Sequence, residues 1–307
     1  MSSKTLLNLF CGALAGLLAL SSASHAGTLV LEHGFENLTG QSGSSAPTVN
    51  YPFGTSYLEY WNRHDAGTDV ISNCEGRRAY EGSNYLHLQF RPGADPCLSQ
   101  NAIYQNNYLQ FGQNFNYPTG DQDRSEFQDT VTSNTMIVRF YFRLTGDWSA
   151  SNDAADNGGG LKFIRVNGNG RVGDEAGALI KLRLDGDSTD PRWNLYDPGT
   201  FRNTYFRTGV NIKDGNWHSM SFKVVLNRTD NSTNNVTMTF WVDDWDMNGP
   251  GHSHTVTCSN FGTGFYSNEL FTNWSASTPV NPMGMDLDKL EVWDGLPFPP
   301  PSPPQVY

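Results

Sequence analysis

The side chains of this chain best suited to chemistry are basic and aromatic residues that alternate with apolar ones. Within residues 136–144, Arg139, Tyr141 and Arg143 alternate with large apolar side chains, and the run Ile-Lys-Leu-Arg-Leu at 180–184 repeats the pattern. Successive side chains of a strand point to opposite faces of its sheet, so the apolar set would enter a core and the basic set would share a surface. Guanidinium groups hold carboxylates and sulfates bidentately, so such a surface could bind an anionic ligand.

The predicted basic face runs against the charge of the whole molecule. The chain has 307 residues, with 20 Lys and Arg against 31 Asp and Glu, and a net charge of -11. A basic face on an acidic protein favours a groove for an extended anionic polymer, although a solvated face of an antiparallel sheet is the ordinary alternative. An acidic chain is a poor candidate for nucleic-acid binding. The predicted face comprises Arg139, Tyr141, Arg143, Lys162, Lys181 and Arg183.

Two histidines differ in the face that the alternation gives them. His87 lies opposite in phase to Leu86 and Leu88, so it could point into a groove and act as an acid or base. His218 is in phase with Phe222 and other apolar residues, which favours a core or rim position over a catalytic one.

Two groups of charged residues have a functional and a structural interpretation. Arg124 and Glu126 are two residues apart, so they would point the same way on a strand and could form a pair that fixes the Arg for a substrate. An exposed ion pair worth about 0–1 kcal/mol is the alternative. Asp243, Asp244 and Asp246 could supply the paired carboxylates of glycoside hydrolysis, but they follow a strand, where Asp commonly begins a turn.

The elements that must position these residues are predicted to be β-strands. Apolar alternation between clusters of Gly, Asn, Asp and Pro predicts ten strands, and no long amphipathic helix is evident. This pattern predicts an all-β fold, a jelly-roll β-sandwich of two curved antiparallel sheets. Segments 41–70 and 100–123 are interpreted as long loops. The predicted strands are 28–32, 84–91, 125–129, 136–144, 161–166, 178–184, 193–196, 217–227, 236–243 and 285–293.

The first 26 residues have the features of a secretory signal peptide. Lys4 precedes an apolar run from Leu6 to Leu20, and Ser24-His25-Ala26 offers small residues before Gly27. The run is too short to span a membrane comfortably. We therefore expect a secreted or periplasmic monomer without a membrane partner, with one domain over 27–296 and a Pro-rich tail over 297–307.

Three cysteines remain after this processing. Export favours disulfide formation, and Cys74 and Cys97 flank the strand predicted near residues 85–90, so they could bridge its two ends. Cys258 is then either a buried thiol or the true partner of one of the others, because sequence alone does not fix the pairing.

Several short motifs resemble those of a known superfamily. Gly215-Asn216-Trp217-His218, a hydrophobic strand and then Phe240-Trp241-Val242-Asp243 are similar to a signature of concanavalin A-like lectin/glucanase jelly rolls. Residues 81–86 and 288–293 resemble the early and closing strands of that superfamily.

Within the superfamily, the polysaccharide lyases of the heparin-lyase-like and alginate-lyase-like groups are the most similar. The tripeptide Arg124-Ser125-Glu126, then Phe140-Tyr141-Phe142 and Asp147-Trp148, resembles their Arg-x-Glu, Tyr-x-Phe and Asp-Trp run. The chain departs from alginate lyases where Phe127-Gln128 replaces Leu-Arg and where Phe163-Ile164-Arg165 occupies the place of Gln-Ile-His. The resemblance therefore implies the fold more firmly than the lyase activity.

The resemblance implies a protein that binds, and could cleave by β-elimination, an acidic polysaccharide. Elimination needs a cation that neutralises the uronate carboxylate, a base, and an acid for the leaving oxygen. Arg139 or Arg183 would be the neutralising group, Tyr141 or His87 the base or acid, and Lys162 and Lys181 would hold neighbouring sugars.

Two alternatives stay open beside the lyase hypothesis. A non-catalytic binding module would use Trp193, Tyr196 and Trp241 as platforms on which sugars stack. A glycoside hydrolase would use the aspartates at 243–246.

The resemblance also implies a structural Ca²⁺ away from the groove. Glu36 and Asp288 lie near the two ends of the predicted domain and could share the ion, with the Gly82 carbonyl as a third ligand. Calcium prefers such hard oxygen ligands.

Overall fold

The computed structural model describes fourteen segments of the chain and assigns β-strands throughout them. The described residues are 27–36, 49–50, 57–62, 68–72, 77–91, 107–111, 133–149, 161–168, 177–183, 189–197, 202–228, 234–258, 264–274 and 283–297. The predicted signal peptide, Arg124, Glu126, Cys74 and Cys97 lie outside these ranges, so the proposed disulfide stays a prediction. No helix in the described ranges is long and apolar enough to cross a membrane.

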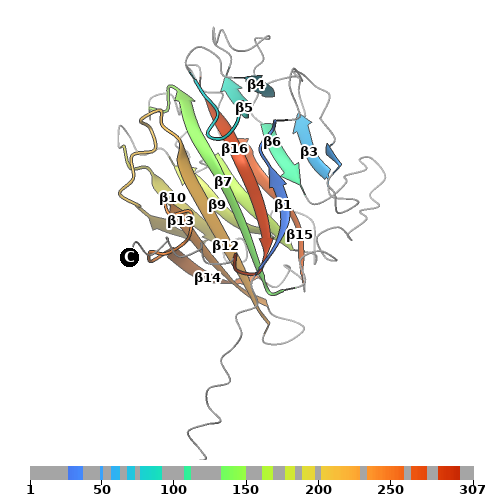
Figure 1. Cartoon of the computed structure of the whole chain (residues 1–307). Helices are drawn as coiled ribbons and strands as arrows, with labels where there is room; N and C mark the ends of the chain where they lie inside the picture. The colour runs from blue at the N-terminus through green and yellow to red at the C-terminus, as the bar shows by residue number, and fades with distance from the viewer. Residues whose placement is uncertain are drawn as a thin grey trace, which may run out of the picture.

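The strands form two antiparallel sheets of eight (Figure 1). The β7 sheet has the order β14-β13-β12-β7-β16-β5-β4, and β1 also pairs with β16. Its strands are β1 Thr28–His33, β4 Thr68–Ser72, β5 Asn84–Arg91, β7 Thr135–Gly146, β12 His218–Arg228, β13 Asn234–Val242, β14 His252–Cys258 and β16 Met283–Asp294.

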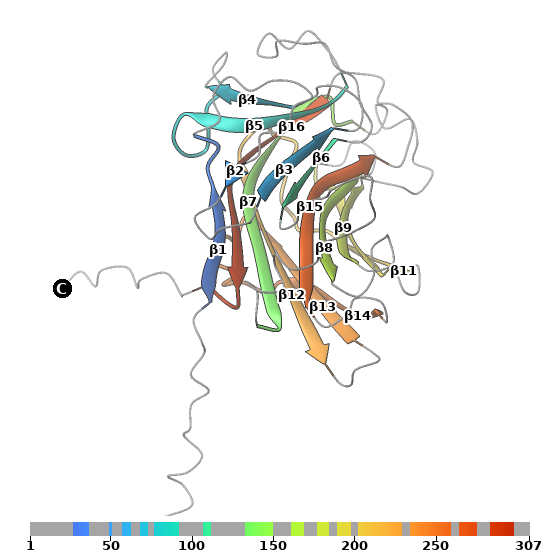
Figure 2. The same ribbon diagram turned by 90° about the vertical axis from the view of Figure 1, so that its right-hand side faces the viewer.

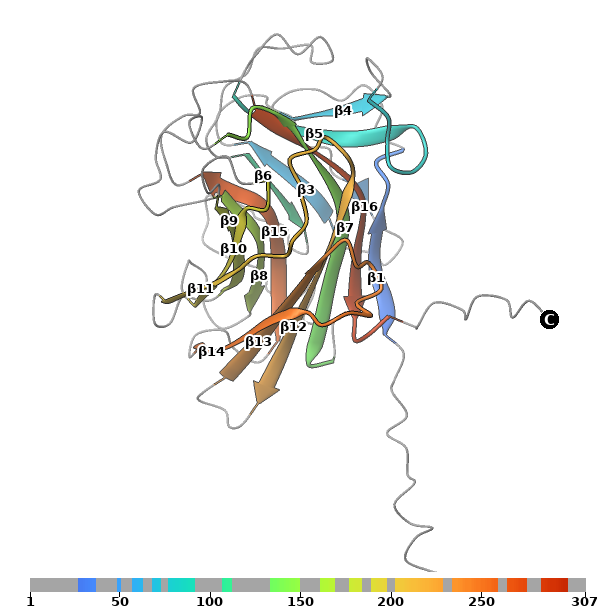
Figure 3. The same ribbon diagram turned by 90° about the vertical axis from the view of Figure 1, so that its left-hand side faces the viewer.

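The second sheet, here called the β8 sheet, has the order β11-β10-β9-β8-β15-β6-β3-β2. The two sheets lie in separate layers when the molecule is turned to either side (Figures 2 and 3). Its strands are β2 Val49–Asn50, β3 Tyr57–Asn62, β6 Asn107–Phe111, β8 Leu161–Gly168, β9 Gly177–Arg183, β10 Arg192–Asp197, β11 Arg202–Phe206 and β15 Phe265–Trp274.

Strand β16 organises the β7 sheet because it has three partners. It pairs with β7 along one side, and on the other side it pairs first with β5 and then with β1. The register with β7 shifts between Asp288 and Glu291, where Lys289 has a φ of 47°. The irregularity lies where β16 changes from one partner to the other.

The core fills the space between the two sheets with aromatic side chains. Phe140 and Phe142 of β7 contact Phe163 of β8, with ring centroids 5.8 and 5.0 Å apart, and all three are fully buried. Phe163 and its neighbour Ile164 are both buried because a register shift between Lys162 and Ile164 interrupts the alternation. The apolar residues of β7 therefore face the core, as their alternation predicted.

The all-β prediction is confirmed, and nine of the ten predicted strands are present in the structure. The tenth, 125–129, lies outside the described residues. The loop interpretation was wrong in part, because β2, β3, β4 and β6 fall largely within 41–70 and 100–123. These strands, like β14, carry many polar residues, so their alternation is weak. The finer jelly-roll connectivity stays a prediction.

Candidate functional site

The six residues of the predicted basic face lie on two different sheets. Arg139, Tyr141 and Arg143 belong to β7, Lys162 belongs to β8, and Lys181 and Arg183 belong to β9. In each strand they alternate with buried core residues, and the core lies between the two sheets. The prediction of one continuous basic face was therefore wrong, because the two groups occupy opposite outer surfaces.

On the β7 sheet, Arg139 is neutralised by an acidic residue of β16. Its Nε and Nη2 atoms donate hydrogen bonds of 3.1 and 2.5 Å to Glu291 Oε2. The guanidinium also lies 4.5 Å from the ring centroid of Trp245 and 5.3 Å from that of Trp293. Only 6% of the Arg139 surface is exposed. Arg139 thus forms a buried ion pair instead of facing a groove.

Arg143 and His87 share a second acidic residue of β16. Arg143 donates from Nε and Nη2 to Asp286 Oδ2 at 2.8 and 2.6 Å, and His87 Nδ1 lies 2.6 Å from Asp286 Oδ1. Asp286 is fully buried, and His87 and Arg143 are 1% and 7% exposed. Trp217 covers the guanidinium, with its ring centroid 4.5 Å away. The predicted groove position of His87 was wrong, since the imidazole is enclosed beside this carboxylate.

Tyr141 is enclosed between two other aromatic rings. The ring centroid of Tyr80 lies 3.4 Å away on one side and that of Trp245 4.7 Å away on the other, both nearly parallel. Burial raises the pKa of the Tyr141 phenol, and a hydrogen bond with Tyr80 and the charge of Asp246 raise it further, against the opposing charge of Arg139. The phenol therefore stays protonated near neutral pH, which argues against Tyr141 as the base of an elimination.

The outer surface of the β8 sheet has a different composition. On four of its eight strands, β8–β11, the outer positions alternate with buried core residues such as Ile180, Leu182 and Leu195. Basic residues stand at five of these positions, but Arg165 is buried and lies opposite Glu269 of the neighbouring strand β15. The residues at these positions whose side chains are described are Lys162, Arg165, Arg192, Asn194, Tyr196 and Tyr205, and of these Arg165 and Asn194 are buried.

Register brings the basic positions of the β8 sheet into rows across the strands. Lys162 lies opposite Lys181, which lies opposite Asn194, and Arg183 lies opposite Arg192. The Arg192 guanidinium lies 5.0 Å from the ring centroid of Tyr205, a tyrosine that is 39% exposed. Sequence reasoning missed Arg165 and Arg192, although both alternate with the apolar residues of their strands.

The three predicted aromatic platforms have different positions. Trp193 is fully buried and packs edge-on against Phe163, with ring centroids 5.0 Å apart, so its prediction as a sugar platform was wrong. Tyr196 is half-buried on the outer side of β10. Trp241, on the other sheet, is 8% exposed, and its Nε1 donates to the Gly249 carbonyl at 2.9 Å.

His218 occupies the core or rim position that its phase predicted. Its Nδ1 lies 2.8 Å from Asp243 Oδ2 and its Nε2 lies 3.0 Å from Asp214 Oδ1, and 5% of the residue is exposed. Burial lowers the pKa of His218, but the hydrogen bonds and charges of the two carboxylates outweigh it and raise the pKa. Asp244 accepts backbone bonds of 3.1 and 2.7 Å from residues 248 and 249, which confirms the turn interpretation of this acidic cluster.

The three residues proposed to bind calcium meet around one turn. Glu36 Oε1 accepts hydrogen bonds from the backbone of Ser83 and Asn84 at 2.8 and 2.9 Å. Gly82 has a φ of +69°, and a Cβ there would lie 2.2 Å from Glu36 Oε1, so only glycine fits. The two Asp288 oxygens accept backbone bonds from residues 81 and 289 at 3.0 and 2.7 Å.

Asp288 is fully buried, and its environment makes its ionised form unfavourable. Burial raises the pKa of Asp288 to about 6, and the charge of Glu36 adds to the effect, although backbone hydrogen bonds oppose it. Two carboxylates that repel each other across one turn suit a cation. Lys289 is one nearby cation, with Nζ 3.0 Å from Glu81 Oε2. No group of three or more His, Cys, Asp or Glu side chains in the described ranges is arranged to hold a metal ion.

Comparison with known proteins gives similarity in structure alone. No protein-family model matches the chain, and no curated protein matches its sequence. Among solved structures, it is similar to an endo-β-1,4-glucuronan lyase from the fungus Trichoderma reesei, with 13% identity and a TM-score of 0.45 over 88% of this chain and 97% of that one. All these likenesses are distant.

Two alginate lyases show the same degree of similarity. The alginate lyase from Aplysia kurodai is 12% identical, with a TM-score of 0.42 over 82% of this chain and 97% of that one. Alginate lyase Aly36B is 13% identical, with a TM-score of 0.42 over 74% of this chain and 96% of that one. Polysaccharide lyases are thus among the similar structures, as the motifs predicted, but at these scores they do not establish what this chain binds.

Proposed function

We propose that the protein binds an acidic polysaccharide along the outer surface of the β8 sheet. The observation that carries the proposal is the register of basic residues across neighbouring strands, with Lys162 opposite Lys181 and Arg183 opposite Arg192. Arg165 is not counted, because it is buried and lies opposite Glu269 of β15. On a chain with a net charge of -11, such a surface attracts an anionic ligand locally while the rest of the molecule repels it.

The arrangement of the surface favours an extended ligand with sugar rings. Neighbouring strands lie about 4.8 Å apart, so the pairs Lys162–Lys181 and Arg183–Arg192 place cations at a spacing that a chain of repeated carboxylates can follow. Tyr196 and the more exposed Tyr205 lie on the same surface. Aromatic rings beside cations suit a polymer that carries both apolar ring faces and charges.

Cleavage by β-elimination is the second candidate function. Arg139, Tyr141 and His87 lie on the opposite sheet and are enclosed by acidic and aromatic partners, which argues against them in the reaction. Arg183 keeps its proposed role of neutralising the uronate carboxylate. A tyrosine of the same surface, Tyr196 or Tyr205, would take the C5 proton as its phenolate and then give that proton to the leaving oxygen. If the protein binds an acidic polysaccharide without cleaving it, the function is that of a non-catalytic binding module.

A binding and activity screen separates these functions. Alginate, glucuronan, heparin and pectate are tested against neutral dextran by calorimetry, with ultraviolet absorbance of unsaturated products followed in parallel. Raising the ionic strength from about 0.1 M to about 1 M shortens the Debye length from about 10 to about 3 Å, so binding to an acidic polymer should weaken. Equal binding of dextran, or no binding of any acidic polymer, contradicts the proposal.

Two half-buried lysines on opposite sheets supply a matched pair of variants. Lys162→Gln removes a cation from the β8 surface and should weaken polymer binding several-fold. Lys223→Gln removes a cation that lies 5.3 Å from the Trp241 ring centroid on the β7 sheet, and should leave binding unchanged. Equal effects of the two substitutions would show that net charge, not this surface, controls binding.

Export is proposed together with this function, because a protein that binds an extracellular acidic polysaccharide must reach it outside the cell. The backbone N–H of Gly27 donates to the Leu296 carbonyl, and a Cβ at Gly27 would lie 2.5 Å from that oxygen. A chain cleaved before Gly27 would therefore begin at a residue already packed against the domain. Intact-mass measurement of the exported protein should give Gly27 as its first residue.

We also propose that Glu36 and Asp288 share a structural Ca²⁺ with the Gly82 carbonyl. The proposal is supported by the mutual repulsion of the two carboxylates and by the cavity of about 330 Å³ beside them, which Glu32, Glu36, Glu81 and Lys289 help to line.

A further inference from the structure

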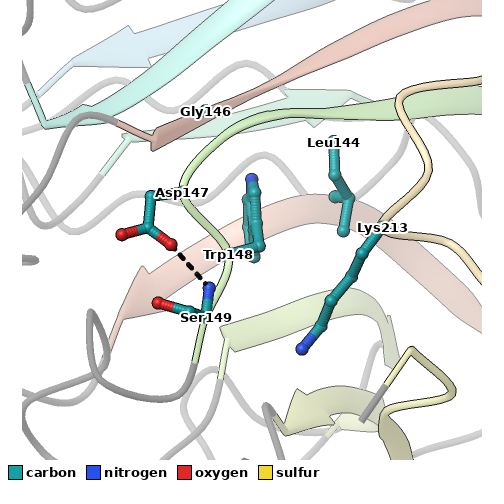
Figure 4. Close-up of a pocket in the computed structure, with 6 residues that line it drawn as sticks. All are labelled: Leu144, Gly146, Asp147, Trp148, Ser149 and Lys213. Atoms are coloured by element: carbon teal, nitrogen blue, oxygen red, sulfur yellow. Dashed lines mark hydrogen bonds between the residues drawn. The ribbon is translucent and has the colours of Figure 1, made fainter. Parts of the chain in front are cut away.

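A small cavity lies at the end of β7, and none of its lining residues belongs to the β8 surface or to the proposed calcium site. Its volume is about 220 Å³, and its walls come from two distant segments, the end of β7 with the residues after it and the loop between β11 and β12 (Figure 4). The lining residues are Leu144, Gly146, Asp147, Trp148, Ser149 and Lys213.

The first wall is held in place by hydrogen bonds. Trp148 Nε1 donates to the carbonyls of Thr145 and Gly284, both at 2.9 Å, and the residue is 4% exposed. Asp147 Oδ1 accepts a bond of 2.9 Å from the Ser149 backbone. The Trp148 indole and the Asp147 carboxylate therefore keep fixed positions, which lowers the entropy cost of binding a ligand.

The second wall is a loop that its own side chains hold in shape. Lys213 follows Ile212, which is fully buried, and its backbone N–H donates to Asn211 Oδ1 at 3.1 Å. The next residue, Asp214, is anchored through its contact with His218. Figure 4 shows the Lys213 side chain on one side of the space, Asp147 and Ser149 on the other, and Trp148 between them.

The chemistry of these groups is that of a site for one sugar acid. An ammonium group pairs with a carboxylate. A protein carboxylate accepts hydrogen bonds from sugar hydroxyls, and a serine hydroxyl can either donate or accept them. Pockets for drug-sized ligands span roughly 300–1,000 Å³, so a cavity of about 220 Å³ suits one ring instead of several.

We propose that this cavity binds a single uronate residue, with its carboxylate on Lys213 and its hydroxyls on Asp147 and Ser149. The inference rests on the proposed acidic-polysaccharide function and adds a subsite to it. The residue can be the terminal unit of a short oligosaccharide or a free monosaccharide, since both present the same carboxylate and hydroxyl groups.

Calorimetric titration of the full chain with glucuronate tests the site, with glucose as the neutral control. Glucuronate should bind and glucose should bind at least tenfold more weakly, because glucose lacks the carboxylate. Lys213→Met should reduce glucuronate affinity at least tenfold, since a charge-assisted hydrogen bond is lost. Asp147→Asn should reduce it less, because the amide still accepts one hydrogen bond from a sugar hydroxyl. Lys223→Met, on the other sheet, should change nothing.

The outcomes for the cavity and for the β8 surface are separable. Lys213→Met with unchanged glucuronate affinity, or glucose bound as tightly as glucuronate, overturns the cavity proposal whatever the polymers do. Loss of polymer binding in Lys162→Gln with intact glucuronate binding supports both proposals. Glucuronate binding that depends on Lys213, without binding of any acidic polymer, supports the cavity and refutes the β8 surface. If glucuronan oligosaccharides compete with glucuronate, the terminal unit of an oligosaccharide can occupy the cavity. If they do not compete, the cavity binds only the free monosaccharide.

Discussion

Both sheets carry basic residues on the side away from the core, but the residues that face them on the neighbouring strand differ in charge. Arg139 and Arg143 of β7 face Glu291 and Asp286 of the neighbouring strand β16. Lys162 of β8 lies in register with another lysine of the neighbouring strand β9. An alternating basic strand therefore does not by itself indicate a ligand surface. The charge of the residue in register on the next strand decides whether a basic residue is neutralised within the sheet, as Glu291 neutralises Arg139.

The largest expected effect is the loss of a buried ion pair on the β7 sheet. Arg143→Met leaves the fully buried Asp286 carboxylate without its guanidinium partner. Removing one member of a buried pair costs about 3–5 kcal/mol, so urea unfolding should show a loss of that size in the free energy of unfolding.

A double variant separates charge from packing in this result. Arg143→Met combined with Asp286→Leu replaces both charges by apolar groups and should recover part of the lost stability, because no carboxylate is left buried without its guanidinium. The recovery is incomplete because the buried His87 imidazole loses its contact with Asp286. A double variant as unstable as the single one would show that packing, for example against Trp217, matters more than the ion pair.

The next effect concerns calcium on the same sheet. If Glu36 and Asp288 share Ca²⁺, the ion at a hundredfold excess over Kd stabilises the folded state by about 2.7 kcal/mol. Chelation should then lower the melting temperature by several degrees, and Asp288→Ala should abolish the response. An identical melting temperature with and without chelator would contradict the calcium proposal. Lys289 would then be the cation that offsets the charges of Glu36 and Asp288.

A smaller effect is expected from His218 as the pH changes. Its pKa is raised in the folded state, so its stabilisation is complete below the unfolded pKa of about 6.5 and is lost as pH rises through the folded pKa. Asp243 and Asp214 are partly exposed, so solvent screening limits the gain to about 1 kcal/mol.

The variant His218→Gln isolates this contribution. Denaturant unfolding between about pH 6 and pH 9 should show a decline in stability for the native chain, beyond that from other groups. The variant should lack this part of the decline. Two parallel pH profiles would show that His218 does not titrate with folding.

The smallest effect is predicted on the β8 surface. Lys162→Gln should change the free energy of unfolding by less than about 0.5 kcal/mol, as surface substitutions usually do, while it weakens polymer binding. A loss comparable to that of Arg143→Met would place Lys162 in an ion-pair layer and remove the contrast between the two sheets.

Much of the fold follows from local alternation, but the function of each face does not. The phase of Phe140 and Phe142 placed β7 correctly against the core. The same rule, applied to β10, puts Trp193 in phase with the buried Leu195, so the misassigned platform could have been recognised. Strands with weak alternation, such as β3 and β14, gave no comparable signal.

The pairing of the basic residues depended on contacts between distant parts of the chain. Arg143 and Asp286 are 143 positions apart, and His87 and Asp286 are 199 apart. No spacing rule connects such residues. The acidic alternation of Asp286-Leu287-Asp288 was a visible indication that β16 carries charges outward, but its neighbour in the sheet became known only from the fold.

The place of β16 has a consequence for how the molecule folds. The last described strand in the chain lies between β7 on one side and β5 and β1 on the other. The β7 sheet therefore cannot close during synthesis until this late segment arrives. Folding dominated by such distant pairings is slow, and a slowly folding chain stays extended for longer. If the protein is exported as proposed, late closure of this sheet would favour passage of the chain in an unfolded state.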